Sequence, residues 1–330
     1  MTIYEVARRA GVSIATVSRA LRDSDLVTPA TRERVRRAVE ELHYTPNRLA
    51  RSLAEGRHAA NGIVFPDLTG PYYAEVVLGY EEAASELGRS VLILATHGRR
   101  DAAAAVVELA GRVDGLAVMG NTVDDAVVRT IAATGTPLVL LARPPVAGID
   151  TIRTRNERTA AELAAHLAAH GHRRIVFVGD PAASPDMAGR HAGLVRGLRA
   201  HGLPAPGCVP CAYDIEAGER AGAELMGQST DAIVCANDEL ALGVHLAAQA
   251  AGRAVPDDLA VTGWDDMLAA RFAGLTTVRQ PMRALGATAA RWLHRRIAER
   301  NVGPGRAVAR RRVLPTQLVV RRSCGPHPLE

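Results

Sequence analysis

The sequence contains no lysine, so all 40 of its basic residues are arginine. A phosphate-binding loop that ends in Lys-Ser or Lys-Thr is therefore impossible. We interpret the arginine usage mainly as a bias of genomic base composition, although arginine is also well suited to phosphate recognition. No apolar run reaches the roughly 20 residues of a membrane helix, and the N-terminal MTIYEVARRAG lacks the apolar segment of a signal peptide. A cytoplasmic protein is expected.

Catalytic and metal-binding motifs are also missing. The chain has no strand-linked GxGxxG, no GxSxG and no HExxH. His166 and His170 lie four residues apart on a predicted helix, but a third ligand is missing, so we expect them to favour the helix C-terminus instead. The sequence therefore predicts a protein that is not an enzyme and that uses no cofactor and no metal.

Cysteine is scarce, with only Cys208, Cys211, Cys235 and Cys324. The CVPC stretch has the spacing of a redox or zinc site, but no second cysteine pair and no suitably spaced histidine accompanies it. We interpret the four as incidental thiols in a reducing compartment.

What the sequence does have is length and an uneven charge. A chain of 330 residues with 48% apolar content predicts two or three domains with buried cores. The net charge is +5, and residues 1–58 hold 11 arginines against 7 acidic residues, which places +4 of it there. A second basic cluster, ARRRV and VVRRS, lies near the C-terminus. Positive charge gathered in a short segment favours a polyanionic partner.

Residues 1–45 predict three short helices. Thr2 and Glu5 form a capping box, Gly11 can end the first helix in the left-handed conformation, and Ser13 can cap the second after a tight turn. Thr28 followed by proline begins the third. The pattern is that of a helix-turn-helix unit. Residues 46–59 predict a short hinge helix and linker that fold only against a partner.

Residues 60–330 alternate between apolar strands and longer helices. Strands are predicted at GIVF, SVLILAT, GLAVMG, PLVLLA, RIVFVG, AIVCAN and LAVTGW. Strands that are apolar on both faces and separated by helices indicate a parallel α/β fold, and the alternation restarts after DTIRTRN, so two lobes are expected. Ligands of such folds bind at the carboxyl ends of strands, which predicts a site between the lobes.

The outer face of the helix in GVSIATVSRAL is small and basic. Ile14 and Ala15 can contact thymine methyl groups and Arg19 can grip guanine, whereas Val17 and Leu21 pack inward. Polar groups that can hold phosphates are Thr2, Ser13, Thr16, Ser18 and the arginines of RERVRR. The alternative from spacing alone is a solvated helix on the surface of an enzyme.

The stretches TIYEVARRAGVSIATVSRAL and TRERVRRAVEELHYTPNRLARSL resemble the DNA-binding head and hinge of the LacI/GalR family of bacterial transcription regulators. The similarity continues through HLAAHGHRRIVFVG, AIVCANDELALGVHLAAQAAGRAVPDDLAVTGWDD and LTTVRQP, and covers residues 2–322. It implies an all-α helix-turn-helix head joined to an α/β, two-lobed domain like the periplasmic binding proteins. The resemblance further implies a nucleoid-associated repressor that binds double-stranded operator DNA as a homodimer. The C-terminal SCGPHPLE has no leucine heptads, which favours a dimer over a tetramer.

The resemblance also assigns the hinge. Family hinge helices pair in the minor groove, where a leucine wedges between base steps; Leu53 matches it, with Asn47 and Arg51 beside it. An apolar side chain on a basic helix suits such a wedge, and a pyrimidine–purine step unstacks most easily. We therefore expect a pseudo-palindromic operator with a central CG step. Without the resemblance, Leu53 would be an ordinary core leucine.

Family effectors, sugars or their derivatives, lie between the lobes. Positions that match effector contacts are Asp67, Tyr72, Tyr73, Arg190, Tyr213, Asn237 and Asp265. Arginine and carboxylate groups suit vicinal hydroxyls, and Tyr72, Tyr213 and Trp264 can supply flat apolar walls. The alternatives are structural, since Asp238 can cap a helix and Asp67 can serve a turn.

One departure from the family lies at the lobe junction, where an acidic residue is usual and Arg155 stands here. The reversed charge suggests either an anionic effector or a site that has lost the ordinary sugar response. In the family, effector binding changes lobe closure and so hinge pairing on DNA. The choice between induction and corepression stays open, as does a second function: a solute-binding protein of the same fold without a regulatory role.

Overall fold

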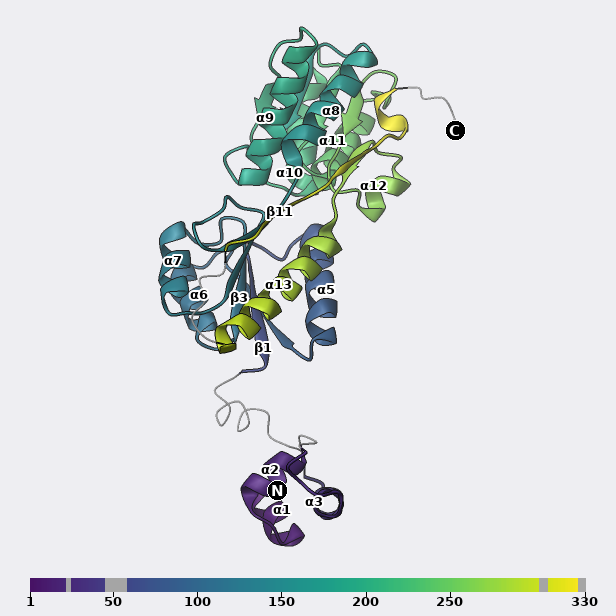
Figure 1. Ribbon diagram of the computed structural model, residues 1–330. Helices are drawn as coiled ribbons and strands as arrows, with labels where there is room; N and C mark the ends of the chain where they lie inside the picture. The colour runs from purple at the N-terminus through teal and green to yellow at the C-terminus, as the bar shows by residue number, and fades with distance from the viewer. Residues whose placement is uncertain (22–24, 45–57, 303–307, 326–330) are drawn as a thin grey trace. The chain divides into compact units, whose positions relative to one another are not determined.

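The computed structural model describes residues 1–21, 25–44, 58–302 and 308–325. The chain divides into two compact units, Met1–His58 and Ala59–Glu330. Each unit has its own hydrophobic core (Figure 1).

The first unit, called the head, contains α1 (Ile3–Ala10), α2 (Ile14–Ala20) and α3 (Pro29–Glu41). The predicted helix caps at Gly11, Ser13 and Thr28 are confirmed. Gly11 ends α1 with φ of 62°, and the Ser13 hydroxyl accepts a hydrogen bond from the backbone N–H of Thr16 at 3.2 Å. At the start of α3, the Thr28 hydroxyl accepts a hydrogen bond from the backbone N–H of Thr31. These caps satisfy backbone groups that short helices leave without partners.

The core of the head is small and apolar. Val6, Val17 and Val35, one from each helix, are at most 1% exposed and pack together. Leu21 is partly buried against them, so the predicted inward faces are confirmed. The opposite face of α2 is thereby left exposed and held in place.

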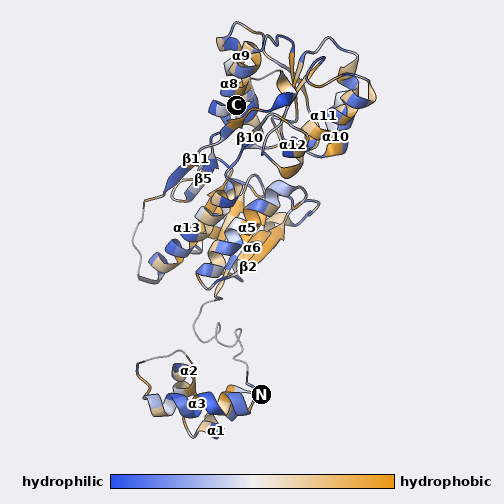
Figure 2. Ribbon diagram, turned by 90° about the vertical axis from the view of Figure 1, so that its right-hand side faces the viewer, coloured by the Kyte–Doolittle hydropathy of each residue, from blue (hydrophilic) through white to orange (hydrophobic). Residues whose placement is uncertain are grey.

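The first lobe of the second unit is built on a six-stranded parallel sheet in the order β11-β5-β4-β3-β1-β2. Its strands are β1 (Ala60–Phe65), β2 (Ser90–Ala95), β3 (Gly115–Met119), β4 (Leu138–Leu141), β5 (Asp150–Thr154) and β11 (Arg311–Leu314). One apolar cluster joins one face of the sheet to α5 (Pro71–Glu86) and α13 (Met282–Val302), and another joins the other face to α6 (Ala102–Ala110) and α7 (Asp125–Ala133). Figure 2 shows the strands near β2 as strongly hydrophobic, whereas β5 and β11 are largely hydrophilic.

Two glycines let α5 and α13 pack closely. A Cβ atom on Gly79 would lie 2.1 Å from the carbonyl oxygen of Arg283, and one on Gly286 would lie 2.1 Å from that of Val76. Both distances are far below van der Waals contact. Any side chain at either position would therefore push the two helices apart.

The second lobe has a four-stranded parallel sheet in the order β7-β6-β8-β9. Its strands are β6 (Ile175–Val178), β7 (Gly207–Val209), β8 (Ala232–Cys235) and β9 (Ala260–Thr262). Figure 2 places α8 (Asn156–Ala169) and α9 (Pro185–Ala200) on one side of this lobe and α10 (Ile215–Met226) and α11 (Asp238–Ala250) on the other. The short α12 (Leu268–Phe272), the antiparallel pair β10 (Thr277–Arg279) and β12 (Gln317–Val319), and a final 3₁₀ turn at Arg322–Cys324 complete it.

The chain passes between the lobes three times, at residues 154–156, 279–282 and 314–317. The seven predicted strands and the two-lobed α/β class are confirmed, and the restart after DTIRTRN coincides with the first crossing. Five strands were not predicted: β5, β7, β10, β11 and β12. They are short, and β5 and β11 carry arginines and polar residues in place of continuous apolar runs. In the part of the chain that the structure describes, no helix is long and apolar enough to cross a membrane.

Candidate functional site

The exposed face of α2 is the first candidate site. Ile14 is 38% exposed although it is a large aliphatic residue, and Ala15 and Arg19 are exposed beside it. The three lie on one side of the helix because they fall at i, i+1 and i+5. An exposed isoleucine at the N-terminal end of a helix, one turn from an exposed arginine, matches the chemistry that reads base edges in the major groove.

Several hydroxyls predicted to hold phosphates already have partners in the head. The Thr2 hydroxyl donates to the Glu5 carboxylate at 3.2 Å, and the Ser13 and Thr16 hydroxyls lie 2.9 Å apart. Ser18 is partly buried. These groups hold the turn in shape, and their phosphate contacts stay a prediction.

The arginines of α3 are tied to acidic neighbours. Arg36 donates to Glu33 and Glu40, and Arg37 donates to Glu33. Sequence reasoning missed Tyr4, which is 68% exposed on α1 and carries a phenol that can reach a phosphate. The sequence feature that could have indicated Tyr4 is a large aromatic residue on the polar side of a short amphipathic helix. The predicted hinge residues Asn47, Arg51 and Leu53 lie outside the described residues.

Arg190 is the centre of the second candidate site. Its side chain on α9 is 4% exposed, and its Nη2 lies 3.8 Å from the Asp265 carboxylate. The Nε–H donates to the Asn156 side-chain oxygen, the Nη1–H donates to the Ala236 carbonyl, and the guanidinium lies 4.8 Å from the centre of the Trp264 ring. Arg190 thus joins segments from four parts of the sequence. A buried guanidinium needs such partners because an unpaired charge is costly in the interior.

Asp265 is held in an unusual conformation. Its φ is 118°, in a region that residues other than glycine rarely adopt. Its Oδ1 accepts a 2.6 Å hydrogen bond from the Gln280 amide, and burial raises its pKa to about 6 even though Arg190 acts in the opposite direction. Strained residues of this kind often cluster at binding sites.

The first lobe contributes two tyrosines from the start of α5. Tyr72 and Tyr73 pack edge to face with ring centroids 5.4 Å apart. Burial, together with Asp186 and Asp265 of the second lobe, raises the pKa of Tyr72. The Tyr72 hydroxyl is buried and has no hydrogen-bond partner among the described residues. We call the side chains of Tyr72, Tyr73, Asn156, Asp186, Arg190, Trp264, Asp265 and Gln280 the interlobe cluster.

Three other predicted contacts use their polar atoms within the fold. Asn237 caps α11 by accepting from the backbone N–H of Leu240 at 2.9 Å, and its amide donates to the Tyr213 carbonyl. The Tyr213 hydroxyl donates to the Asp180 carbonyl at 2.6 Å. Asp67 accepts from two backbone N–H groups of its own turn, the structural alternative considered for it. Their effector contacts stay predictions, because each polar group already has a structural partner.

The cap of α11 corrects one expectation. Asp238 was a candidate helix cap, but the cap is Asn237, one residue earlier. Asp238 is 1% exposed and instead accepts hydrogen bonds from the Thr277 hydroxyl and the Met267 backbone N–H. Burial, with Asp265 nearby, raises the pKa of Asp238 to about 8.

Sequence reasoning missed Asn156, Asp186 and Gln280. Asn156 links the cluster because its amide donates to Asp186 while its oxygen accepts from Arg190. Gln280 and Asn156 both lie where the chain crosses between the lobes. A polar residue beside a predicted lobe junction is therefore the sequence feature that could have identified them as site residues. Asp186 follows Pro185 at the start of α9, a position that resembles ordinary helix initiation.

Arg155 does not lie among the buried groups. Its side chain is exposed, and its backbone carbonyl accepts a hydrogen bond from Thr316. The arginine of this segment that acts on the cluster is Arg153, which is also exposed. Burial raises the pKa of Asp186, and Arg153, like Arg190, opposes this rise. Exposure of Arg155 does not test the anionic effector that this residue suggested, which stays one of the two alternatives.

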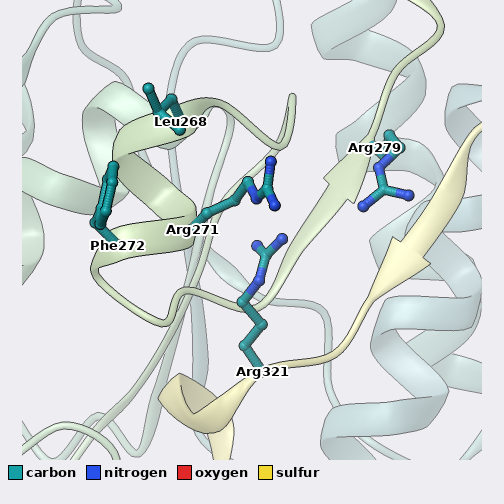
Figure 3. Close-up of a pocket in the computed structure, with 5 residues that line it drawn as sticks. All are labelled: Leu268, Arg271, Phe272, Arg279 and Arg321. Atoms are coloured by element: carbon teal, nitrogen blue, oxygen red, sulfur yellow. The ribbon is translucent and has the colours of Figure 1, made fainter.

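A separate pocket of about 440 Å³ lies in the second lobe and is lined by Leu268, Arg271, Phe272, Arg279 and Arg321. Figure 3 shows the three guanidinium groups turned toward the same space. Asp266 pairs with Arg279 and Arg321. Leu268 and Phe272 are 64% and 80% exposed, so α12 presents apolar side chains to its surroundings.

The cysteines and histidines noted in the sequence have structural surroundings. All four cysteines are free thiols, and burial raises the pKa of Cys211 to about 11, which disfavours the reactive thiolate. His166 lies in the last turn of α8, as expected, and its Nε2 lies 3.3 Å from the Cys324 Sγ.

A helix-turn-helix head followed by a two-lobed α/β domain with a polar interlobe cluster defines a DNA-binding regulator of the periplasmic-binding-protein type. The model of the lacI family of bacterial regulatory proteins matches residues 2–47, and that of a periplasmic binding protein-like domain matches residues 164–324. The regulator DegA of Bacillus subtilis is 32% identical over 337 residues, covering 98% of each chain. Catabolite control protein A of Priestia megaterium is 33% identical over 303 residues, covering 89% of this chain and 91% of that protein.

Solved structures agree over the full length. The lac repressor dimer bound to operator and the anti-inducer ONPF matches with a TM-score of 0.87 at 29% identity, and each chain covers 99% of the other. The CelR–cellobiose complex matches with a TM-score of 0.72 at 31% identity, covering 98% of this chain and 99% of that one. The protein belongs to the LacI family and is a transcriptional regulator, not an enzyme. The DNA-binding head favours this function over a solute-binding protein without a regulatory role.

Proposed function

We propose that this protein is a repressor that binds a pseudo-palindromic operator as a homodimer and is controlled by a carbohydrate-like effector at the interlobe cluster. The observation that carries the proposal is the pairing of two sites in one chain. An exposed reading face of Ile14, Ala15 and Arg19 is joined to a buried polar cluster drawn from both lobes. As a DNA-binding regulator it acts in the cytoplasm, at the nucleoid.

On the DNA side, Ile14 and Ala15 contact thymine methyl groups and Arg19 contacts guanine. Thr2, Ser13, Thr16 and Ser18 position the head on phosphates. Asn47 and Arg51 accompany Leu53, which wedges into the minor groove at a central CG step. These roles rest on the exposed face of α2 and on similarity to the family.

On the effector side, Arg190 and Asp265 bind hydroxyl groups while Tyr72 and Tyr73 close over the ligand from the first lobe, with Asp67, Tyr213 and Asn237 at the edge of the site. A ligand that contacts both lobes favours one lobe orientation over another. CelR is a relative whose structure contains cellobiose, which supports a carbohydrate effector.

The point where the chain enters the first lobe, at Ala59, supports coupling between effector binding and DNA binding. The Ala59 backbone N–H donates to the Asp114 carboxylate at 3.0 Å, and Asp114 also forms an ion pair with Arg89. The chain that follows residues 46–58 is thereby fixed to the sheet of the first lobe. Movement of this lobe is then transmitted to the segment that we assign to the hinge.

A homodimer suits a pseudo-palindromic operator, because two-fold symmetry in the DNA is matched by two heads. The lac repressor is a dimer in its operator complex. Exposed Leu268 and Phe272 on α12 offer apolar surface for such a contact in this chain.

Gel retardation tests the proposed function. The intact protein is incubated with fragments of its own upstream region and with scrambled duplexes, at 50 and 200 mM salt, and the retained fragments are sequenced. We expect a retained sequence with two half-sites and an affinity that falls steeply with salt. Equal retention of all fragments, or no retention, would overturn the proposal.

A further inference from the structure

Asp186 is an acidic group of the interlobe cluster whose charge is only partly compensated, because burial raises its pKa although Arg190 and Arg153 act in the opposite direction. It lies deep in the protein, yet its side chain keeps some solvent access, as expected of a group that lines a recess. Its hydrogen bond within the cluster comes from the Asn156 amide at 2.8 Å. An ionised carboxylate can accept about four hydrogen bonds, so Asp186 has capacity left for a ligand.

Three neighbouring polar side chains of the cluster also hold buried atoms without hydrogen-bond partners among the described residues. The Gln280 side chain is 4% exposed and donates to Asp265, while its oxygen is buried without a partner among the described residues. Tyr72 and Trp264 likewise hold a buried O–H and N–H without partners there. Buried polar groups are rarely left unpaired, and these three surround the Arg190–Asp265 pair. Together they offer donors and acceptors, which is the complement of a hydroxylated molecule.

The charge around this position is acidic. Asp265 is buried and Asp186 and Glu239 are half-buried, and burial raises the pKa of all three carboxyl groups. Opposite them stand the buried Arg190 and the exposed Arg153, whose charge is screened by solvent. An anionic ligand would add negative charge to a site that already holds an excess of it.

We propose that Asp186 determines effector class: the effector donates a hydrogen bond to Asp186 from a hydroxyl or a protonated amine and carries no negative charge. Neutral and amine-bearing carbohydrates fit the site, with amine-bearing ones favoured, and phosphorylated or acidic sugars are rejected. This inference rests on the proposed function, because it assumes that the interlobe cluster binds the effector.

The first test compares ligands that share one framework but differ in charge. Titration calorimetry at pH 7 on the intact protein uses glucose, glucosamine and glucose 6-phosphate, with cellobiose and its amine-bearing analogue as the disaccharide pair. We expect the amine-bearing member of the better-bound pair to bind about 10- to 100-fold more tightly than its neutral partner, as for hydrogen bonds to charged groups. In Asp186→Asn this preference disappears. Asp101→Asn, which removes an exposed carboxylate of the first lobe, serves as the control and keeps the preference.

Tighter binding of the phosphorylated sugar than of the neutral one would overturn the inference, as would a preference for the amine that survives in Asp186→Asn.

A second measurement needs no ligand. If Asp186 serves a ligand, Asp186→Asn leaves the thermal unfolding midpoint unchanged or raises it, because an undercompensated buried charge is removed. A clear drop would show that Asp186 is a structural residue and would overturn the proposal even if no tested sugar binds. Sequence-specific DNA retention in the same preparation separates failure of this inference from failure of the proposed function.

Discussion

The head and the interlobe cluster hold their candidate recognition side chains in opposite surroundings. In the head, the candidate reading side chains are exposed on one helix, while different residues, Val6, Val17 and Val35, form the core. In the interlobe cluster, the candidate binding side chains are themselves buried, and Arg190 and Asp265 stabilise each other. Recognition and stability are therefore separable in the head and shared in the cluster.

This difference has consequences for mutation. Replacing an exposed reading residue removes a contact with DNA and little else, because surface substitutions change stability only slightly. Replacing Arg190 or Asp265 leaves a buried partner without its charge or hydrogen bond. Three predictions test this contrast, in order of the expected effect on stability.

The largest effect is expected for Arg190→Met, which keeps the size of the side chain but removes its charge. The Asp265 carboxylate would stay buried without its cation, and the Asn156 and Ala236 oxygens would lose their donor. We expect a loss of about 3–5 kcal/mol in the free energy of unfolding. Urea denaturation followed by tryptophan fluorescence measures it, because Trp264 and Trp292 both lie in the second unit.

A double variant serves as its control. Arg190→Met combined with Asp265→Asn removes both charges, so part of the lost stability should return. A loss below about 1 kcal/mol in the single variant, typical of a surface position, would contradict the shared role of this pair.

An intermediate effect is expected from pH. The pKa of Asp238 is raised to about 8, so between about pH 4 and pH 8 the folded protein holds a proton that the unfolded chain has released. The stability from this proton is complete below pH 4 and is lost as the pH rises toward 8. The slope is about 1.4 kcal/mol per pH unit. In the head the sign is opposite: hydrogen bonds lower the pKa of Glu5 and Glu33, so stability there is lost as the pH falls.

Urea denaturation at pH 5, 6 and 7 compares the wild type with Asp238→Asn. The difference in free energy between the two proteins should change by about 1.4 kcal/mol for each pH unit. Asp101→Asn should follow the wild type. Parallel pH profiles for the wild type and Asp238→Asn would refute the assignment of this proton to Asp238.

The same contrast explains how much the sequence could predict. Ile14, Arg19 and their caps lie within ten residues, so helical periodicity and capping rules were sufficient to predict which face of α2 is exposed. Apolar runs and their spacing were likewise sufficient for the central strands. Asn156 and Gln280 join the cluster at crossings between the lobes, whereas Asp186 joins it from the start of α9, where the local pattern is that of ordinary helix initiation. Strand β5 and its neighbour β11, at the edge of the sheet, were missed because their arginines and polar residues break the apolar pattern.

The smallest effect on stability, and the sharpest test of the head, is expected for Arg19→Ala. Arg19 is exposed near the end of α2, so the free energy of unfolding should change by less than about 0.5 kcal/mol. Loss of a bidentate guanine contact should weaken binding to the retained operator by about 1–3 kcal/mol, which is roughly 5- to 150-fold.

Arg37→Ala on α3 is the control, because it removes a positive charge without removing a group from the reading face. Fluorescence anisotropy on operator and scrambled duplexes should show an operator-specific loss for Arg19→Ala and equal, smaller losses for Arg37→Ala. Equal losses on both duplexes for Arg19→Ala would reduce its role to phosphate binding, and recognition would then lie elsewhere on the head.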